Sequence, residues 1–247
     1  MDGLTAAVAL GAALAGFVQG LSGFAFGLVA MAVWAWVLDP PLAGPLVVIG
    51  SLIGQALALP MLRHGFDLRR AAPFLLGGVL GVPLGVALLP RIDPLAFRLG
   101  VGLLLLAWCP AMLLARDLPR VTRGGALADG AAGLLGGVMG GLGGLTGPAP
   151  TLWITLRGWD RPAQRAVFQL YNLVMQTLTM GTYLATGAVT AEVTRLGLVV
   201  APAMLVPSLL GTLLYRRISD AAFRRVVLGL LALSGLVLVA TTLPRLL

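Results

Sequence analysis

The side chains of this sequence that could do chemistry are amides and hydroxyls placed inside apolar stretches. Gln169, Asn172 and Gln176 are spaced three and four residues apart, which puts them on one face of a helix. Polar side chains in an apolar helix avoid lipid, so this face either hydrogen-bonds to a neighbouring helix or lines a hydrated path. Ser51 and Gln55, also four residues apart, are a sparser equivalent earlier in the chain.

Two glycine-rich stretches, 16–27 and 136–148, interrupt long apolar runs. A helix break at membrane depth leaves backbone N–H and C=O groups unpaired, so it is tolerated only where it lines a cavity or is buried in protein. The helix that starts after such a break has a positive end that suits an anion. The donors we expect are the backbone amides of 22–26 and 144–147, with the side chains of Gln19, Ser22 and Thr146. The alternative is that the glycines only let helices pack closely.

These two features together predict a substrate-binding site. Its residues are Gln19, Ser22, Gly23, Phe24, Gly143, Gly144, Thr146, Gln169, Asn172 and Gln176.

The residues that catalysis or metal binding would need are scarce. The one histidine, His64, lies beside an arginine in a basic loop, and the one cysteine, Cys109, lies in an apolar run. Ser22 has no base near it in the sequence, and there is no phosphate-binding loop. We therefore expect no enzyme activity, no metal site and no cofactor.

Composition indicates a multi-pass helical membrane protein. The chain is 59% hydrophobic and only 11% charged, whereas soluble domains have about 25% charged residues. The expected apolar segments are 4–38, 42–62, 71–89, 95–114, 126–156, 162–187, 196–214 and 223–243. Most have the roughly 20 residues that span a bilayer core. The first and fifth are longer and contain the glycine-rich stretches, so each is interpreted as two short helices.

The two halves of the chain repeat. Gly85 to Arg98 matches Gly211 to Arg224 at an offset of 126, and the first glycine-rich stretch matches the second at an offset of 120 (Gly16 on Gly136). We expect a single membrane domain, 1–247, with repeat one at about 1–118 and repeat two at about 124–247. Each repeat would hold a glycine-broken helical hairpin and three transmembrane helices.

Arginine placement predicts the topology. All 17 basic residues are arginine, and arginines gather in cytoplasmic loops. If each glycine-broken segment enters and returns on the same side, one side holds thirteen arginines and the other four, which makes the repeats inverted and puts both termini outside. The four are Arg91, Arg98, Arg195 and Arg245. A net charge of +8 therefore reflects topology, and we expect no nucleic-acid partner.

The repeated halves, the glycine-broken start of each, and the run from Gln19 to Phe24 resemble the TauE/SafE family of membrane transporters, also called toluene sulfonate uptake permeases. The likeness covers essentially the whole chain. The resemblance implies movement of sulfur-containing anions such as sulfite or sulfonates.

We thus expect a secondary transporter or exporter of small anions in the bacterial inner (plasma) membrane, with the substrate bound at the two glycine-rich breaks near the bilayer midplane. Its partners would be the anion and the lipid bilayer. A coupling ion (proton or sodium) and a homo-oligomer are both compatible with this reading. The alternative is an accessory or structural membrane subunit without transport activity of its own.

Overall fold

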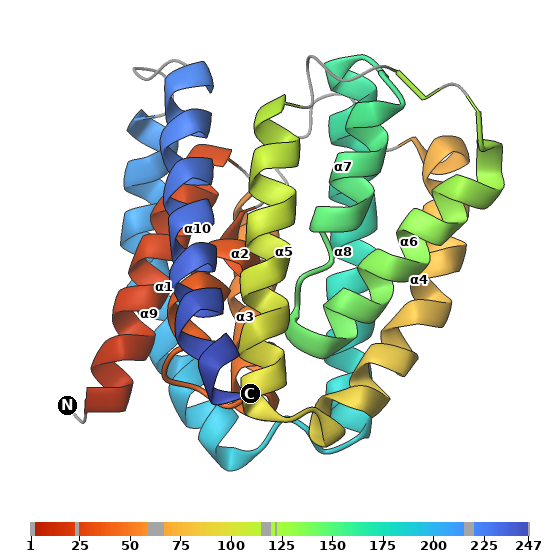
Figure 1. Cartoon of the computed structure of the whole chain (residues 1–247). Coiled ribbons are helices and arrows are strands. Elements are labelled where there is room, and N and C mark those ends of the chain that lie inside the picture. Colours follow the sequence, from red (N-terminus) through yellow and green to blue (C-terminus); the bar gives the residue numbers. More distant parts are fainter. Residues whose placement is uncertain are drawn as a thin grey trace.

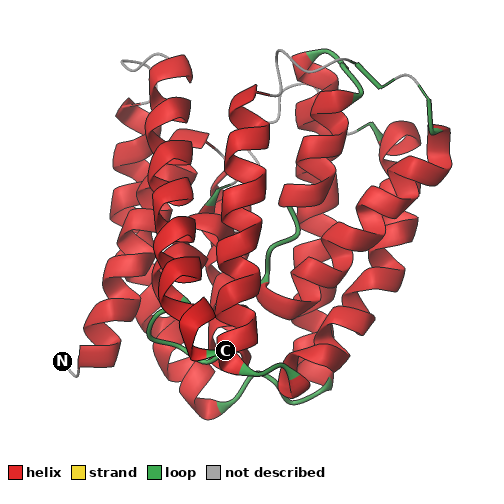
Figure 2. Cartoon of the chain, in the orientation of Figure 1, coloured by secondary structure: helices red, strands yellow, loops and turns green. Residues whose placement is uncertain are grey.

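The computed structural model describes residues 3–22, 25–58, 67–114, 120–121, 123–214 and 220–246. Every element in these ranges is a helix (Figure 2). The longer helices are α1 (Gly3–Ser22), α3 (Pro40–Ala58), α4 (Leu68–Leu88), α5 (Pro94–Leu114), α6 (Gly125–Gly143), α8 (Arg161–Ala185), α9 (Ala191–Leu214) and α10 (Asp220–Thr242). The short elements are α2 (Phe26–Trp34), α7 (Pro148–Leu156) and the 3-10 turns η2 (Leu89–Arg91) and η3 (Leu243–Arg245).

Seven of the described helices are long and apolar enough to cross a membrane. Their outer surface confirms the prediction of a helical membrane protein, because large apolar side chains stay exposed on it. On α4, leucines repeat every four residues: Leu76 is 70% exposed, Leu80 67% and Leu84 55%. Lipid is the medium that accepts such a face. The chain is therefore a multi-pass helical membrane protein. Helix α8 is not one of the seven, because polar residues occupy its buried face.

The two nine-residue helices, α2 and α7, are too short to cross the bilayer. Nine residues rise about 13 Å, less than half of the roughly 30 Å hydrocarbon core. Helix α1 ends at Ser22 and α2 begins at Phe26, whereas α6 ends at Gly143 and α7 begins at Pro148. Gly144, in the second interval, has φ +69°, a backbone conformation that favours glycine. These two pairs of helices occupy the two longest apolar segments, so each segment holds one membrane-length helix and one short helix, not the two short helices that the sequence predicted.

Glycines let two pairs of long helices touch backbone to backbone. A Cβ on Gly20 of α1 would lie 2.0 Å from the carbonyl oxygen of Ser208 on α9. A Cβ on Gly77 of α4 would likewise lie 2.0 Å from the oxygen of Gly130 on α6. Small residues are the usual means of close helix packing in membranes. The packing role expected as the alternative for glycine is thus present along these helices.

The helices gather into two groups with the short helices between them (Figure 1). Helix α1 packs on α9 and α5 on α10, whereas α4 packs on α6 and α8. Helix α3 contacts both groups through α9 and α8. Both chain ends lie at the same end of the bundle, and the turn between α7 and α8 lies at the opposite end (Figure 1). This arrangement brings α1, α3, α5, α6, α7 and α8 around one interior point.

Candidate functional site

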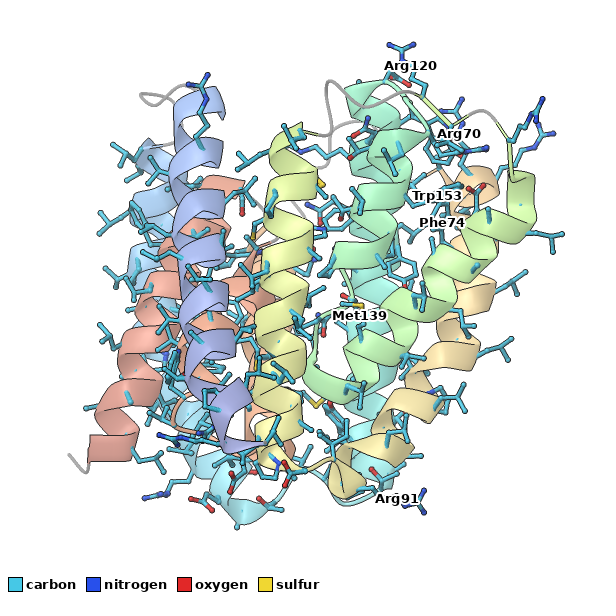
Figure 3. All side chains as sticks on the ribbon, in the orientation of Figure 1. Arg70, Phe74, Arg91, Arg120, Met139 and Trp153 are labelled. Atoms are coloured by element: carbon cyan, nitrogen blue, oxygen red, sulfur yellow. The ribbon has the colours of Figure 1, made fainter. Side chains whose placement is uncertain are left out.

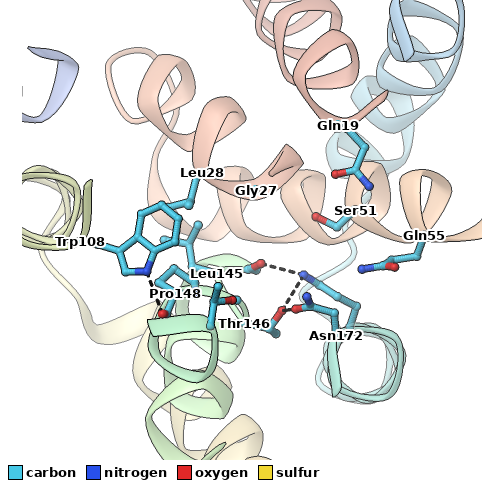
Figure 4. Close-up of a pocket in the computed structure, with 14 residues that line it drawn as sticks. Gln19, Gly27, Leu28, Ser51, Gln55, Trp108, Leu145, Thr146, Pro148 and Asn172 are labelled. Carbon is cyan, nitrogen blue, oxygen red and sulfur yellow. Dashed lines mark hydrogen bonds between the residues drawn. The ribbon is translucent and has the colours of Figure 1, made fainter. Parts of the chain in front are cut away.

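A small polar cavity lies between the ends of α1 and α6 and the starts of α2 and α7 (Figure 4). Its volume is about 20 Å³, enough for about one water molecule. Its lining comes from six helices and the interval between α6 and α7, and consists of Gln19, Gly27, Leu28, Ser51, Gln55, Trp108, Gly144, Leu145, Thr146, Gly147, Pro148, Thr151, Asn172 and Gln176. None of these described lining residues carries a charge at neutral pH.

Gln19 connects α1 to the start of α2. Its Oε1 accepts a hydrogen bond of 3.0 Å from the backbone N–H of Phe26. Because that N–H can only donate, the oxygen of the amide must face it, and Nε2 is left for the cavity side. Gln19 is 3% exposed. It is thus a buried side chain that both fixes the interval between two helices and supplies a donor to the cavity.

The Ser22 hydroxyl hydrogen-bonds to backbone groups close to it in the sequence. Its Oγ donates to the carbonyl oxygen of Val18 at 2.8 Å and accepts from the backbone N–H of Ala25 at 3.2 Å. The N–H groups of Ala25 and Phe26, which the sequence suggested as substrate donors, are therefore already bonded to side chains. Buried N–H groups at a helix start need partners, and nearby polar side chains supply them here.

The second interval is held by a chain of hydrogen bonds to α8. Gln176 Nε2 donates to the carbonyl oxygen of Gly144 at 2.8 Å and to Thr146 Oγ1 at 3.2 Å. Thr146 Oγ1 in turn donates to Asn172 Oδ1 at 2.5 Å. The carbonyl oxygen of Gly144 only accepts, so Gln176 must present Nε2 to it, and the same Nε2 donates to Thr146 Oγ1. Thr146 Oγ1 then donates its own hydrogen to Oδ1 of Asn172, which leaves Nδ2 of Asn172 facing the cavity. The N–H groups of Gly144 and Leu145 are bonded to α6 carbonyls and are not available to an anion.

Three further helices complete the wall. Ser51 and Gln55 on α3 are 7% and 6% exposed, and they line the cavity together with Asn172 of α8 (Figure 4). Trp108 on α5 donates from Nε1 to the carbonyl oxygen of Pro148 at 2.8 Å. Leu28 of α2 adds an apolar surface. The indole therefore anchors the first residue of α7 while its ring lines the cavity.

The structure brings together some of the residues that the sequence suggested and leaves others aside. Those that line the cavity are Gln19, Gly144, Thr146, Asn172 and Gln176. Three described residues are outside the lining: Ser22, Gly143 and Gln169. Gly143 packs instead toward Met31 and Phe97, and Gln169 is buried at 6% exposure elsewhere on α8. Gly23 and Phe24 lie outside the described residues.

Sequence reasoning missed Trp108 and Thr151 in this wall, and it treated Ser51 and Gln55 only as a sparse counterpart. The spacing of four shared by Ser51 with Gln55 and by Asn172 with Gln176 was the available signal for α3. Nothing in the sequence distinguishes Trp108 from any other tryptophan in an apolar helix.

The buried acid lies away from the cavity. Asp129 on α6 is 5% exposed. It accepts a hydrogen bond of 2.7 Å from Trp153 Nε1 and lies 3.5 Å from Arg157 Nε. Among the described residues there is no group of three metal-ligating side chains. The cavity itself can therefore offer hydrogen bonds and helix ends, with no ionised group of its own.

A family model described as the sulfite exporter TauE/SafE matches residues 8–238. The chain belongs to the TauE/SafE family. No curated protein and no solved structure matches it. TauE/SafE proteins are membrane transporters, and the family description points to export of sulfite or a related anion. The apolar helices and the uncharged cavity of this TauE/SafE protein fit that class.

Proposed function

We propose that this TauE/SafE protein is a secondary transporter of small anions, sulfite or related sulfur-containing anions, which bind in the cavity between the two helix intervals. The observation that carries the proposal is the chemistry of the wall. Among the described residues, Gln19 Nε2 and Asn172 Nδ2 are donors with no protein partner, and none of the lining residues has a carboxylate. Hydrogen-bond donors in a buried site of low dielectric favour an anion.

The packing of the helices supports the inverted-repeat part of the proposal. If α1 to α5 correspond to α6 to α10, then the α1–α9 contact corresponds to the α6–α4 contact, and α5–α10 and α3–α8 correspond to themselves; all four contacts are present. In Figure 1 α1 runs upward and α6 downward. These opposite directions support the proposal that equivalent helices of the two repeats are inverted.

Glycine contacts supply the register of this correspondence. Gly16 of α1 abuts the carbonyl oxygen of Met204 on α9, and Gly137 of α6 abuts that of Gly78 on α4. The offset between Gly16 and Gly137 is 121, and that between Gly78 and Met204 is 126. The second value agrees with the sequence comparison, whereas the first differs by one residue from the expected 120. Adjacent glycines such as Gly136 and Gly137 made the two registers indistinguishable in sequence.

The same register relates the two polar pairs of the cavity. At an offset of 121, Ser51 and Gln55 of α3 fall on Asn172 and Gln176 of α8. All four side chains line the cavity. This supports a site built by both repeats about the axis that relates them. Such a position suits alternating access, in which one repeat moves against the other around a fixed site. At about 20 Å³ the cavity is in a closed form that must widen to admit an oxyanion.

We propose further that the protein lies in the bacterial inner membrane with both termini outside the cytoplasm. Arg70 and Arg120 lie at one end of the bundle and Arg91 at the other (Figure 3), which fits the bias of thirteen arginines to four. Single cysteines at 120 and 91, in a Cys109→Ser background, should react with an impermeant maleimide from the cytoplasmic and the outer side, respectively. Labelling of both from one side would refute the topology.

Flux measurements test the function. Protein reconstituted in liposomes should move sulfite, and an Asn172→Leu variant should lose most of that flux because a cavity donor is removed. Thr177→Val is the matched control, because Thr177 is exposed on the same helix and its hydroxyl bonds only to the carbonyl oxygen of Leu173. Absence of flux for every anion by correctly folded protein would favour the accessory-subunit alternative.

A further inference from the structure

Two polar atoms on the cavity wall are buried without a hydrogen-bond partner among the described residues. They are Gln176 Oε1 and Thr151 Oγ1. Gln176 is 3% exposed, and its Nε2 is held by the carbonyl oxygen of Gly144. A carbonyl oxygen only accepts, so the amide cannot flip, and Oε1 remains an acceptor in need of a donor.

A fully deprotonated oxyanion cannot satisfy this acceptor. All of its oxygens accept hydrogen bonds, so it would leave Gln176 Oε1 unpaired or set one oxygen against another, and an unpaired buried acceptor is costly. A singly protonated oxyanion has both features that the wall requires. Its hydroxyl can donate to Gln176 Oε1, and its remaining oxygens can accept from Gln19 Nε2 and Asn172 Nδ2.

We propose that the cavity selects the singly protonated, singly charged form of an oxyanion, with its hydroxyl donated to Gln176 Oε1; for sulfite this form is hydrogen sulfite. The inference rests on the proposed anion-transport function and adds the protonation state of the substrate. The proton then crosses the membrane on the substrate, and each molecule moves one negative charge.

The described residues that line the cavity include no titratable side chain that could take the proton from the substrate. The helices that line it hold the following charged or titratable residues whose side chains are described: Arg98 and Cys109 on α5, Asp129 on α6, Arg157 at the end of α7, and Arg165, Tyr171 and Tyr183 on α8. None of these lines the cavity. The two tyrosine hydroxyls donate to the carbonyl oxygens of Gly133 and Gly141. No described side chain at the site can therefore take up the proton.

The decisive measurement is the pH dependence of binding to the purified wild-type protein, with sulfite and methanesulfonate as the two probes. Above the second pKa of sulfite, the apparent Kd for total sulfite should rise about tenfold per pH unit, because the competent form falls by that factor. The Kd for methanesulfonate, which has no proton to lose in this range, should stay constant. A flat sulfite profile, or a parallel change for both probes, would overturn the inference while leaving anion binding intact.

A variant and an ion replacement sharpen the test. Gln176→Leu should abolish the preference for sulfite over methanesulfonate at low pH, whereas the Thr177→Val control should keep it. The ratio of the two affinities is the readout, because loss of the bond to Gly144 affects both probes alike. If replacing sodium with choline abolishes sulfite binding to the wild type but not to Gln176→Leu, Gln176 Oε1 is a sodium ligand and the inference is wrong. If neither probe binds at any pH, the proposed function itself fails.

Discussion

Substitutions of Gln19 can separate an effect on stability from an effect on anion binding. Its Oε1 holds the start of α2, whereas its Nε2 faces the cavity. In Gln19→Leu both are lost at nearly constant volume. The N–H of Phe26, bonded at 3.0 Å in a residue that is fully buried, is left without its acceptor. The expected loss of stability is about 1–3 kcal/mol, which lowers the melting temperature by roughly 2–4 °C per kcal/mol in a chain of this length.

Gln19→Glu keeps the acceptor for Phe26 and changes only the atom on the cavity side. When the new carboxyl group is ionised it repels an anion, and when protonated it can still donate. Binding of methanesulfonate, itself independent of pH in the native site, should therefore fall as pH rises in this variant alone. Loss of one charge-assisted hydrogen bond, about 1.5–3 kcal/mol, corresponds to a rise in Kd of roughly 10- to 150-fold.

Melting temperature and calorimetric Kd should be measured on the same preparations of both variants. Leu14→Val is the matched control, since Leu14 is 48% exposed on the same helix and should change neither quantity. The reasoning is refuted if Gln19→Leu binds methanesulfonate with native affinity, or if Gln19→Glu melts as low as Gln19→Leu.

Three other substitutions probe the frame around the site. Gly81→Leu should destabilise the protein by about 1–3 kcal/mol or more, because a Cβ there would lie 2.3 Å from a backbone oxygen of α6; Gly100→Leu, with nothing within 4 Å, should melt like wild type. Asp129→Asn should cost on the order of 3 kcal/mol by leaving Arg157 without its counter-charge, and Arg157→Gln added to it should recover part of the melting temperature. Trp108→Phe should lower the melting temperature because the carbonyl oxygen at the start of α7 loses its indole donor, at a cost of about 1–3 kcal/mol.

The helices could be predicted from the sequence because charge and proline mark where each apolar run stops. The expected segment 95–114 became α5, Pro94–Leu114, and 71–89 became α4, Leu68–Leu88. Asp93, which directly precedes α5, accepts from the N–H groups of Leu95 and Ala96 and so caps the start of that helix. The site residues Asn172 and Gln176 could also be predicted from the sequence, since polar residues one turn apart in an apolar helix must share a buried face.

The remaining site residues depend on distances that sequence does not encode. Trp108 meets Pro148 across forty residues of chain, and only the packing of α5 beside α7 makes that contact. The backbone amides of Ala25 and Phe26 were expected to face the substrate, but the side chains of Ser22 and Gln19 satisfy them first. A local capping bond forms without the substrate, so it takes precedence wherever a polar side chain lies within reach.

In the inverted-repeat arrangement that we propose, the two halves are alike at the cavity and differ at the open ends of their hairpins. Trp34 Nε1 at the end of α2 donates to the carbonyl oxygen of Val8 on α1. Trp153 Nε1 of α7 donates to the side chain of Asp129 on α6, and Asp129 follows Val8 at the offset of 121. Among the described residues, the second closure alone adds an ion pair, between Asp129 and Arg157, and it lies toward the end of the bundle that holds Arg70 and Arg120 (Figure 3). If one repeat moves against the other around the cavity, as we propose, the hairpin closed by Asp129 and Arg157 should cost more to open than the hairpin closed by Trp34.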